Sequence, residues 1–268
     1  MATDNVTSRK EGRLAGRNAL ITGASRGIGQ AIACAYAAEG ANVFLTATDL
    51  GRLEETRELV EARSVAVLCH AADVADPDAV AALFAAAVAW RGGVDVVVNN
   101  AGIYIGKPFI DYELAELDRL MRVNAYSVFQ LMQLAIRHMH ERGAGKIVNI
   151  ASTAGKWESP NQAAYNISKH AVVGMTRCAA LENAARGINI NAICPGMVET
   201  DMWQDFSSHA DAQGISLDEL KKGSLARIPM GRFLEPEEVA HVAVYLGSSE
   251  SDGMTGQTIT ISGGMRMG

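Results

Sequence analysis

A tyrosine and a lysine four residues apart, Tyr165 and Lys169, are the side chains in this sequence best placed to do chemistry. Ser159 and Pro160 have the residue types of a helix cap and first turn, and Gly187 that of a helix stop, which predicts a helix over 160–186. Positions four apart share a helix face, and a nearby cation lowers the pKa of a phenol from about 10. Tyr165 would then exchange a proton with an alcohol or a carbonyl. Alternatively, both are ordinary surface side chains, because this spacing is common by chance.

Seven short apolar runs recur along the chain, and each predicts a β-strand. They occupy residues 19–21, 43–45, 65–68, 94–98, 147–150, 188–193 and 258–261. Stretches long enough for a helix lie between them, such as 29–39 and 52–62. This alternation predicts an α/β fold, with a parallel sheet covered by helices on both faces. The chain has no linker, repeat or low-complexity tract, so residues 14–268 are expected to form a single domain.

Residues 203–228 interrupt this alternation. They contain no strand signal and mix Asp, Ser, His, Gln and Gly, with weak helical character. An excursion of this length in a compact domain is usually a lid or a binding loop, so 203–228 is predicted to be a substrate-binding lid. The alternative is a surface insertion without a function.

The composition is that of an ordinary soluble globular protein, with 49% hydrophobic and 20% charged residues. A net charge of −6 and the lack of a basic run argue against a nucleic-acid partner. Four widely spaced cysteines suit free thiols in a reducing compartment, so a cytoplasmic location is expected. No spacing of cysteine or histidine indicates a metal site.

Neither a signal peptide nor a membrane span is expected. Residues 1–13 are polar and lack an apolar core, which predicts a flexible leader. The longest apolar run, Ala79 to Trp90, is shorter than the roughly 18 residues of a membrane helix and is predicted to be a buried alanine-rich helix.

A glycine-rich turn follows the first predicted strand. Gly23, Gly27 and Gly29 would let the backbone approach a pyrophosphate, which would lie at the positive N-terminus of the next helix. Their spacing differs from the common dinucleotide fingerprint G-x-G-x-x-G. A strand before the turn and a helix after it nevertheless favour dinucleotide binding.

Five motifs in order make the sequence similar to the short-chain dehydrogenase/reductase family. They are T-G-x-x-x-G-x-G at 22–29, Asn99-Asn100-Ala101-Gly102, Ser152 thirteen residues before Tyr165, Y-x-x-x-K at 165–169, and Pro195-Gly196. The resemblance covers about residues 14–266. It implies a Rossmann fold, a doubly wound sheet of seven strands that binds a nicotinamide cofactor at the carboxyl ends of its strands.

The resemblance assigns four residues to catalysis. Tyr165 would be the general acid or base, Lys169 would hold the nicotinamide ribose and lower the pKa of the tyrosine, and Ser152 would hydrogen-bond the substrate oxygen. Asn124 would order a water chain from the lysine to solvent; otherwise it is a buried amide that bends its helix. Hydride would pass between cofactor and carbonyl carbon while Tyr165 moves the proton.

The other cofactor contacts are implied in the same way. Besides Tyr165 and Lys169, they are Gly23, Ser25, Arg26, Gly27, Ile28, Gly29, Thr48, Asp49, Asp73, Val74, Asn100, Ala101, Gly102, Pro195, Gly196, Val198 and Thr200. The alternative for Asp73 is a cap of the following helix.

The end of the second strand distinguishes two nicotinamide cofactors. An acidic residue there would grip the ribose of NAD, but Ala47 occupies the usual position. Thr48 and Arg26 resemble the pair found in bacterial ketoacyl reductases that use NADP, whereas Asp49 would repel a 2′-phosphate if it turned inward. NADP(H) is therefore slightly favoured, with NAD(H) as the alternative.

Two subgroups of the family compete for the substrate. Residues 22–29 and 46–48 look like those of 3-oxoacyl-(carrier protein) reductases. Those enzymes, however, have a basic residue on the long helix that holds the acidic carrier protein, and Leu181 stands in its place here. Residues 200–203, the long segment after them and residues 230–240 are more similar to acetoin, butanediol and polyol dehydrogenases. The expected substrate is a small secondary alcohol, diol or polyol and its ketone. Ser152 and Tyr165 would contact it, and Trp157 and Trp203 are either pocket walls or plain core.

Two alternative functions fit the same motifs. One is a 3-oxoacyl-(carrier protein) reductase, and the other is a nucleotide-sensing relative without catalysis. Family members usually form homotetramers through two long helices, here near 111–137 and 160–186, and through the C-terminal strand. The second of these has apolar residues available for such contacts, namely Ile167, Val172 and Met175.

Overall fold

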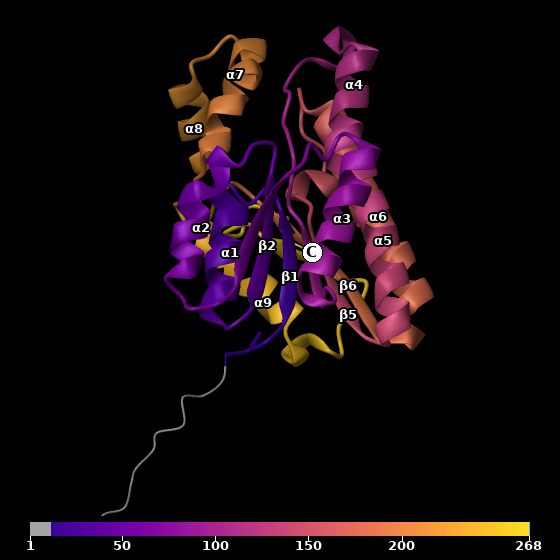
Figure 1. Cartoon of the computed structure of the whole chain (residues 1–268). Helices are drawn as coiled ribbons and strands as arrows, with labels where there is room; N and C mark the ends of the chain where they lie inside the picture. The colour runs from indigo at the N-terminus through magenta and orange to yellow at the C-terminus, as the bar shows by residue number, and fades with distance from the viewer. Residues whose placement is uncertain (1–11, 268) are drawn as a thin grey trace, which may run out of the picture.

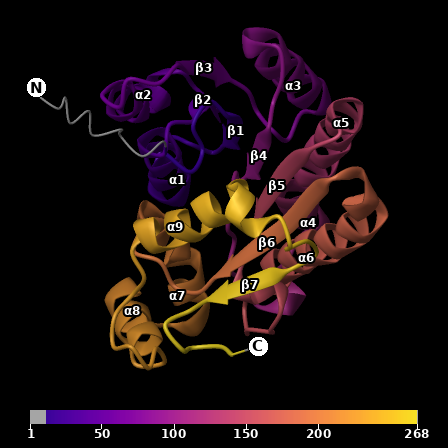
Figure 2. The same ribbon diagram turned by 90° about the horizontal axis from the view of Figure 1, so that it is seen from below.

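Seven parallel strands form the centre of the molecule, in the order β3-β2-β1-β4-β5-β6-β7. The structure is a computed structural model that describes residues 12–267, and Figures 1 and 2 show it from two sides. The strands are β1 (Asn18–Thr22), β2 (Asn42–Ala47), β3 (Val67–Ala71), β4 (Val96–Asn99), β5 (Gly145–Ile150), β6 (Ile188–Pro195) and β7 (Thr258–Ile261). Each of the seven predicted strands is present, which confirms the predicted fold class.

Helices cover both faces of this sheet, as Figure 2 shows. One face carries α1 (Gly27–Ala38), α2 (Glu54–Glu61) and α9 (Pro236–Gly247), and the other carries α3 (Pro77–Arg91), α5 (Ser127–Arg142) and α6 (Ala163–Asn183). Two hydrophobic cores result, one around Ile32 and Val244 and one around Leu83 and Leu131. The alanine-rich run is α3, which buries only the face that carries Val80, Leu83, Phe84 and Ala87.

The catalytic helix α6 begins later than the sequence predicts. It starts at Ala163 rather than Pro160, because Asn161 has the left-handed backbone conformation (φ 58°), which a right-handed helix cannot contain. Its C-terminus agrees with the prediction: a 3₁₀ turn over Ala184–Arg186 ends at Gly187, which has a φ of 72°.

The predicted lid is helical and stands at the carboxyl ends of the strands. It consists of a 3₁₀ segment (Asp201–Phe206), α7 (Ser207–Gln213) and α8 (Leu217–Leu225), and Figure 1 shows α7 and α8 rising above the sheet opposite α4 (Leu114–Met121). We call residues 203–228 the lid segment. Trp203, Ile228 and Phe233 form a small hydrophobic cluster at its base.

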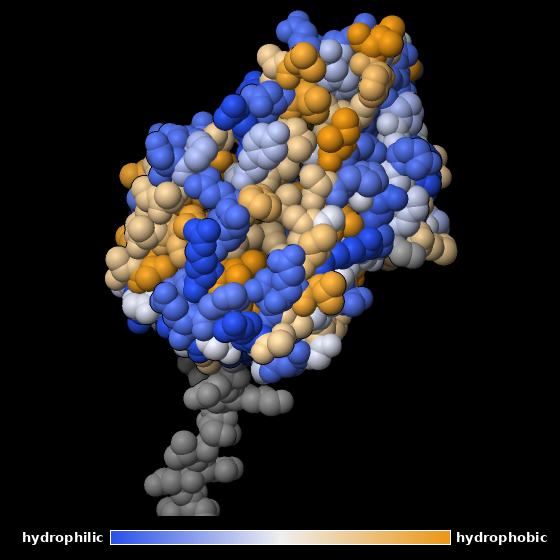
Figure 3. Space-filling view, turned by 90° about the vertical axis from the view of Figure 1, so that its right-hand side faces the viewer, coloured by the Kyte–Doolittle hydropathy of each residue, from blue (hydrophilic) through white to orange (hydrophobic). Residues whose placement is uncertain are grey.

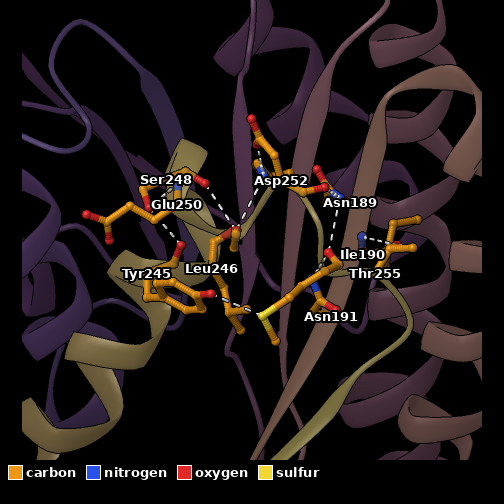
Figure 4. A network of polar contacts seen from close by, with 12 residues as sticks. Asn189, Ile190, Asn191, Tyr245, Leu246, Ser248, Glu250, Asp252 and Thr255 are labelled. Carbon is orange, nitrogen blue, oxygen red and sulfur yellow. Dashed lines mark hydrogen bonds and ion pairs between the residues drawn. The ribbon is translucent and has the colours of Figure 1, made fainter.

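A polar network fastens the turn between α9 and β7 to the sheet, as Figure 4 shows. The Asn189 side chain donates to the carbonyls of Asp252 and Met254, and Asn191 also donates to Met254. Because β7 is an edge strand, these bonds hold its preceding turn in register with β6.

The predicted leader lies mostly outside the described residues, which begin at Gly12. Arg13, its last residue, belongs to the folded domain, since its guanidinium donates to Glu39 at 2.6 Å. In the described part of the chain, no helix combines the length and the apolar character needed to cross a membrane.

Candidate active site

One cavity of about 800 Å³ opens at the carboxyl ends of β1, β4, β5 and β6, and the lid segment forms its far wall. Almost all predicted site residues line it, including Ser152, Tyr165 and Lys169. Two predicted residues do not line it, namely Asp49 and Asn124. Parallel strands bring their carboxyl ends to one edge, and the strand order reverses between β1 and β4, where ligands of such sheets bind.

The glycine-rich turn leaves the N-terminus of α1 open toward this cavity. Arg26 is the N-cap residue but makes no side-chain capping bond, and the first turn of α1 contains no acidic residue. Its free N–H groups and positive end suit the pyrophosphate of a dinucleotide. A β-carbon on Gly29 would lie 2.1 Å from the carbonyl oxygen of Gly23, so only glycine lets the turn close. The residues present therefore fit the predicted cofactor.

Tyr165 and Ser152 meet inside the cavity. The Ser152 side chain hydrogen-bonds to Tyr165, and its Oγ also accepts a bond from the backbone N–H of Ala154 at 3.1 Å. Burial raises the pKa of Tyr165 to about 12, and the bond with Ser152 opposes this rise. The phenol therefore holds its proton at neutral pH in this structure, ready to donate it.

Lys169 lies behind the tyrosine ring. Its Nζ is 5.8 Å from the centroid of the Tyr165 ring and donates to the carbonyl of Ile150 at 2.9 Å. Burial lowers the pKa of Lys169 to about 8. Burial is the largest influence on the pKa of Tyr165, and the predicted lowering of this pKa by Lys169 stays a prediction.

Asn124 is fully buried behind the cavity wall. It lies in a five-residue π-helical segment, Arg122–Tyr126, that joins α4 to α5. Its Oδ1 accepts from the Ile103 backbone at 2.8 Å, and its Nδ2 donates to the Ile103 carbonyl and to Ser168 Oγ. The predicted role in ordering water stays a prediction; the observed bonds fix the loop after β4.

The loop after β2 differs from the sequence prediction. Asp49 turns away from the cavity and accepts a bond from the backbone N–H of Gly51 at 2.8 Å. Arg52 lines the cavity beside Thr48 instead, and it forms no ion pair with any described residue. Arg26 also lines the cavity, at the N-terminus of α1, with its guanidinium 3.7 Å from the Asp201 carboxylate. The tight turn at Gly51 thus leaves the basic Arg52, and not the acidic Asp49, in the cavity wall after β2.

Asp73 and Val74 line the cavity after β3, as predicted. The alternative role of Asp73 as a helix cap is wrong, because Asp76 caps α3 by accepting from the N–H of Asp78. In the described residues no group of three or more His, Cys, Asp and Glu side chains could hold a metal ion.

The lid side of the cavity is rich in aromatic side chains. Trp157 and Trp203 line it, and Trp203 also packs on Phe233 with ring centroids 4.9 Å apart. Phe206 and His209 are among the lining residues that were not predicted from the sequence. Both contact Tyr104, a residue from the loop after β4, and no local pattern signals a contact across about a hundred positions.

A Rossmann-type sheet, an open helix N-terminus at its switch point and a serine–tyrosine–lysine group define a nicotinamide-dependent oxidoreductase. Comparison with known proteins agrees: residues 23–266 match the family model described as enoyl-(acyl carrier protein) reductase. The chain belongs to the short-chain dehydrogenase/reductase family.

Relatives span the whole folded chain. The chain is 38% identical to 3-oxoacyl-(acyl-carrier-protein) reductase of Staphylococcus aureus over 252 residues, which are 94% of this chain and 98% of that one. The structure of a variant of actinorhodin polyketide ketoreductase with NADPH matches with a TM-score of 0.89 and 37% identity, covering 93% of this chain and 97% of that one. A short-chain type dehydrogenase/reductase from Mycobacterium marinum matches with a TM-score of 0.86 and 33% identity, covering 95% and 97% of the two chains.

Proposed function

We propose that this oxidoreductase uses NADP(H) to interconvert a secondary alcohol, diol or polyol and its ketone, with Tyr165 as the acid or base. The meeting of Ser152, Tyr165 and Lys169 in one cavity carries this proposal. A non-catalytic relative would have no need to keep all three.

The chain's own residues divide the work. Ser152 Oγ is held by the Ala154 N–H and hydrogen-bonds to Tyr165, so a substrate oxygen placed between the two would be polarised from both sides. In reduction, Tyr165 gives its proton to this oxygen as negative charge develops on it. Lys169, a buried cation behind the ring, stabilises the phenolate that remains. When bound, the nicotinamide supplies or accepts the hydride.

Basic side chains in the cavity support NADP(H) over NAD(H). Arg52 lines it after β2 and Arg26 lines it at the start of α1, whereas Asp49 does not line it. A 2′-phosphate beside Thr48 would find the Arg52 side chain, which has no ion-pair partner in the described residues. Arg26, in contrast, is shared with the Asp201 carboxylate. The actinorhodin ketoreductase with a similar fold holds NADPH.

The lid segment supports a polar substrate of modest size. Gln213, Glu219, Ser224 and Arg227 line the cavity beside its aromatic wall. Hydroxyl groups of a diol or polyol would find hydrogen-bond partners among them.

A second candidate is the reduction of a 3-oxoacyl thioester. The name of the Staphylococcus aureus relative favours it. Against it, the exposed side chain at position 181 is leucine, where that subgroup places a basic residue to hold its acidic carrier.

Steady-state assays separate these candidates. The protein is mixed with NADPH or NADH and either acetoin, a keto-sugar or acetoacetyl-CoA, and the absorbance of the reduced cofactor is followed. The proposal expects the highest kcat/KM with NADPH and a hydroxyketone. Preference for acetoacetyl-CoA would establish the second candidate, and a lack of turnover with every ketone would refute both.

A homotetrameric assembly and a cytoplasmic location complete the proposal. Exposed apolar side chains on α4, α5 and α6 suit a homotetramer, and Figure 3 shows hydrophobic groups gathering at the upper end of this face, where α4 lies. Among them are Leu114, Phe129 and Ile167, whereas Val172 faces the core. The four cysteines are free thiols, which suits the reducing cytoplasm.

A further inference from the structure

A buried hydrogen bond joins the lid segment to the loop after β4. Tyr104 and His209 are 6% and 5% exposed, and Tyr104 Oη lies 2.7 Å from His209 Nδ1. Burial raises the pKa of Tyr104 and lowers that of His209, so both side chains are neutral at pH 7. None of the roles described above uses this bond.

Two neighbouring contacts hold α7 at the same place. The backbone N–H of Gly106 donates to Ser208 Oγ at 3.2 Å, and His209 also hydrogen-bonds with the backbone of Asn161. The loops that carry Gly106 and Asn161 are themselves joined, since the Lys107 N–H donates to the Asn161 carbonyl at 2.9 Å. α7 is therefore anchored on both loops that border the catalytic helix.

Gly106 makes this approach possible. A β-carbon there would lie 2.7 Å from His209 Cβ and 2.8 Å from Tyr104 Oη. Any larger residue would push α7 away from the loop.

The Tyr104 ring connects this anchor to the catalytic tyrosine. Its centroid is 5.1 Å from that of Tyr165, with the rings at 67°, and 4.2 Å from that of Phe206, with the rings nearly parallel at 15°. Tyr104 thus lies between a lid residue and the residue that moves the proton. A shift of Tyr104 would leave the Tyr165 ring without one of its supports.

We propose that Tyr104 and His209 are positioning residues, whose hydrogen bond holds the lid segment against the cavity and the Tyr165 ring in its reactive place. This inference rests on the proposed reductase function. Neither residue needs to touch the substrate for it to hold.

The test compares variants that remove the bond with variants that keep it. Tyr104→Phe and His209→Ala each remove it, Gly106→Ala displaces α7, and His209→Asn keeps an acceptor near the position of Nδ1. Tyr126→Phe and His241→Ala are matched controls, because both side chains are exposed on other elements. kcat and KM are measured with a ketone that the wild type reduces, and amide hydrogen exchange of residues 203–213 with NADPH present.

Removing the bond is expected to lower kcat about tenfold while KM changes less than threefold, because a lost buried hydrogen bond is worth about this factor. Amide exchange in the lid segment should quicken about tenfold. The double variant Tyr104→Phe/His209→Ala should lose no more than His209→Ala alone, because His209→Ala already removes the bond to Tyr104 together with the bond to Asn161. His209→Asn and the two controls should behave as the wild type.

Other results overturn the proposal. A rise in KM with unchanged kcat would mean that the pair only lines the substrate site. His209→Asn behaving as His209→Ala would exclude the hydrogen bond as the cause. If a variant fails to fold, as judged by lost NADPH binding, Gly106→Ala and His209→Asn decide the question. The exchange measurement needs no turnover, so an inactive wild type would refute the proposed function and leave the lid anchor to be judged on exchange alone.

Discussion

Tyr165 has a high pKa and a hydrogen-bond partner, so its phenol is protonated at neutral pH and can act as a proton donor. Its pKa of about 12 follows from burial, and Ser152 is the contact that opposes it. Tyr165→Phe should therefore lower kcat by about 10²–10⁴, the usual contribution of a general acid. NADPH affinity, measured by fluorescence titration, should stay within about twofold, because most cofactor contacts remain. The exposed Tyr126→Phe is the control, and activity of Tyr165→Phe near that of the control would refute the assignment.

Because Lys169 is buried, the stability of the protein should rise with pH. A lysine in a surface ion pair would have the opposite effect, because its pKa is raised in the folded protein. The pKa of Lys169 is lowered from 10.5 to about 8 in the folded protein, so between these values the unfolded chain binds a proton that the folded chain has released. The burial penalty is complete below pH 8 and is relieved as the pH rises, at up to about 1.4 kcal/mol per pH unit. The free energy of unfolding in urea of the wild type, relative to Lys169→Met, should rise between pH 8 and 10. A constant or falling difference would contradict this.

The position of Arg52 leads us to expect that NADPH binds more tightly than NADH. Arg52 lines the cavity, as Thr48 does, and has no ion-pair partner in the described residues. Arg52→Ala should weaken NADPH binding about tenfold and leave NADH binding unchanged, because only NADPH carries a 2′-phosphate. Isothermal titration with both cofactors checks this, with the exposed Arg63→Ala as control. An equal loss for both cofactors would place Arg52 elsewhere on the dinucleotide.

The first turn of α1 can form only because residue 29 is glycine and has no side chain. Gly29→Ala would bring a β-carbon to 2.1 Å from the Gly23 carbonyl oxygen and 2.5 Å from Asn100 Nδ2. We expect a loss of stability of about 1–3 kcal/mol and loss of cofactor binding, measured by thermal unfolding with and without NADPH. Gly174→Ala is the matched control, since an exposed glycine in α6 with open space around it should gain about 0.5–1 kcal/mol. Equal behaviour of the two variants would refute the steric argument.

Local patterns predicted the elements well and the contacts between distant segments poorly. Apolar runs locate all seven strands, including β3 and β7, none of whose residues is fully buried, and β7 matches to the residue. The start of α6 was missed because one left-handed residue, Asn161, overrides a good capping signal. Arg52 was missed because the direction of the Asp49 side chain depends on a tight turn. Tyr104 and His209 carry no signal until the fold brings them together.

For the whole molecule, the exposed apolar side chains predict self-association. Phe129 on α5 is 52% exposed, and Leu114 on α4 and Ile167 on α6 are exposed as well, so these three neighbouring helices carry a group of exposed apolar side chains. If this face is an interface, Phe129→Glu should reduce the mass measured by light scattering from that of a tetramer to that of a dimer or monomer. Leu59→Glu on α2, also an exposed apolar position at 45%, should leave the mass unchanged. A wild type that is monomeric at micromolar concentration would refute the tetramer.

The π-helical segment at Asn124 contains one residue more than a regular α-helical turn would. This extra residue sets the rotation of α4 about the helix axis relative to α5. Deleting any one of its five residues would allow a continuous α-helix, the more favourable backbone in isolation, yet would turn α4 by about 100° relative to α5. Asn124 would then lose its hydrogen bonds to Ile103 in the loop after β4. The number of residues from Leu114 to Arg142 therefore sets where Asn124 lies relative to Ile103 and so supports the cavity wall from behind.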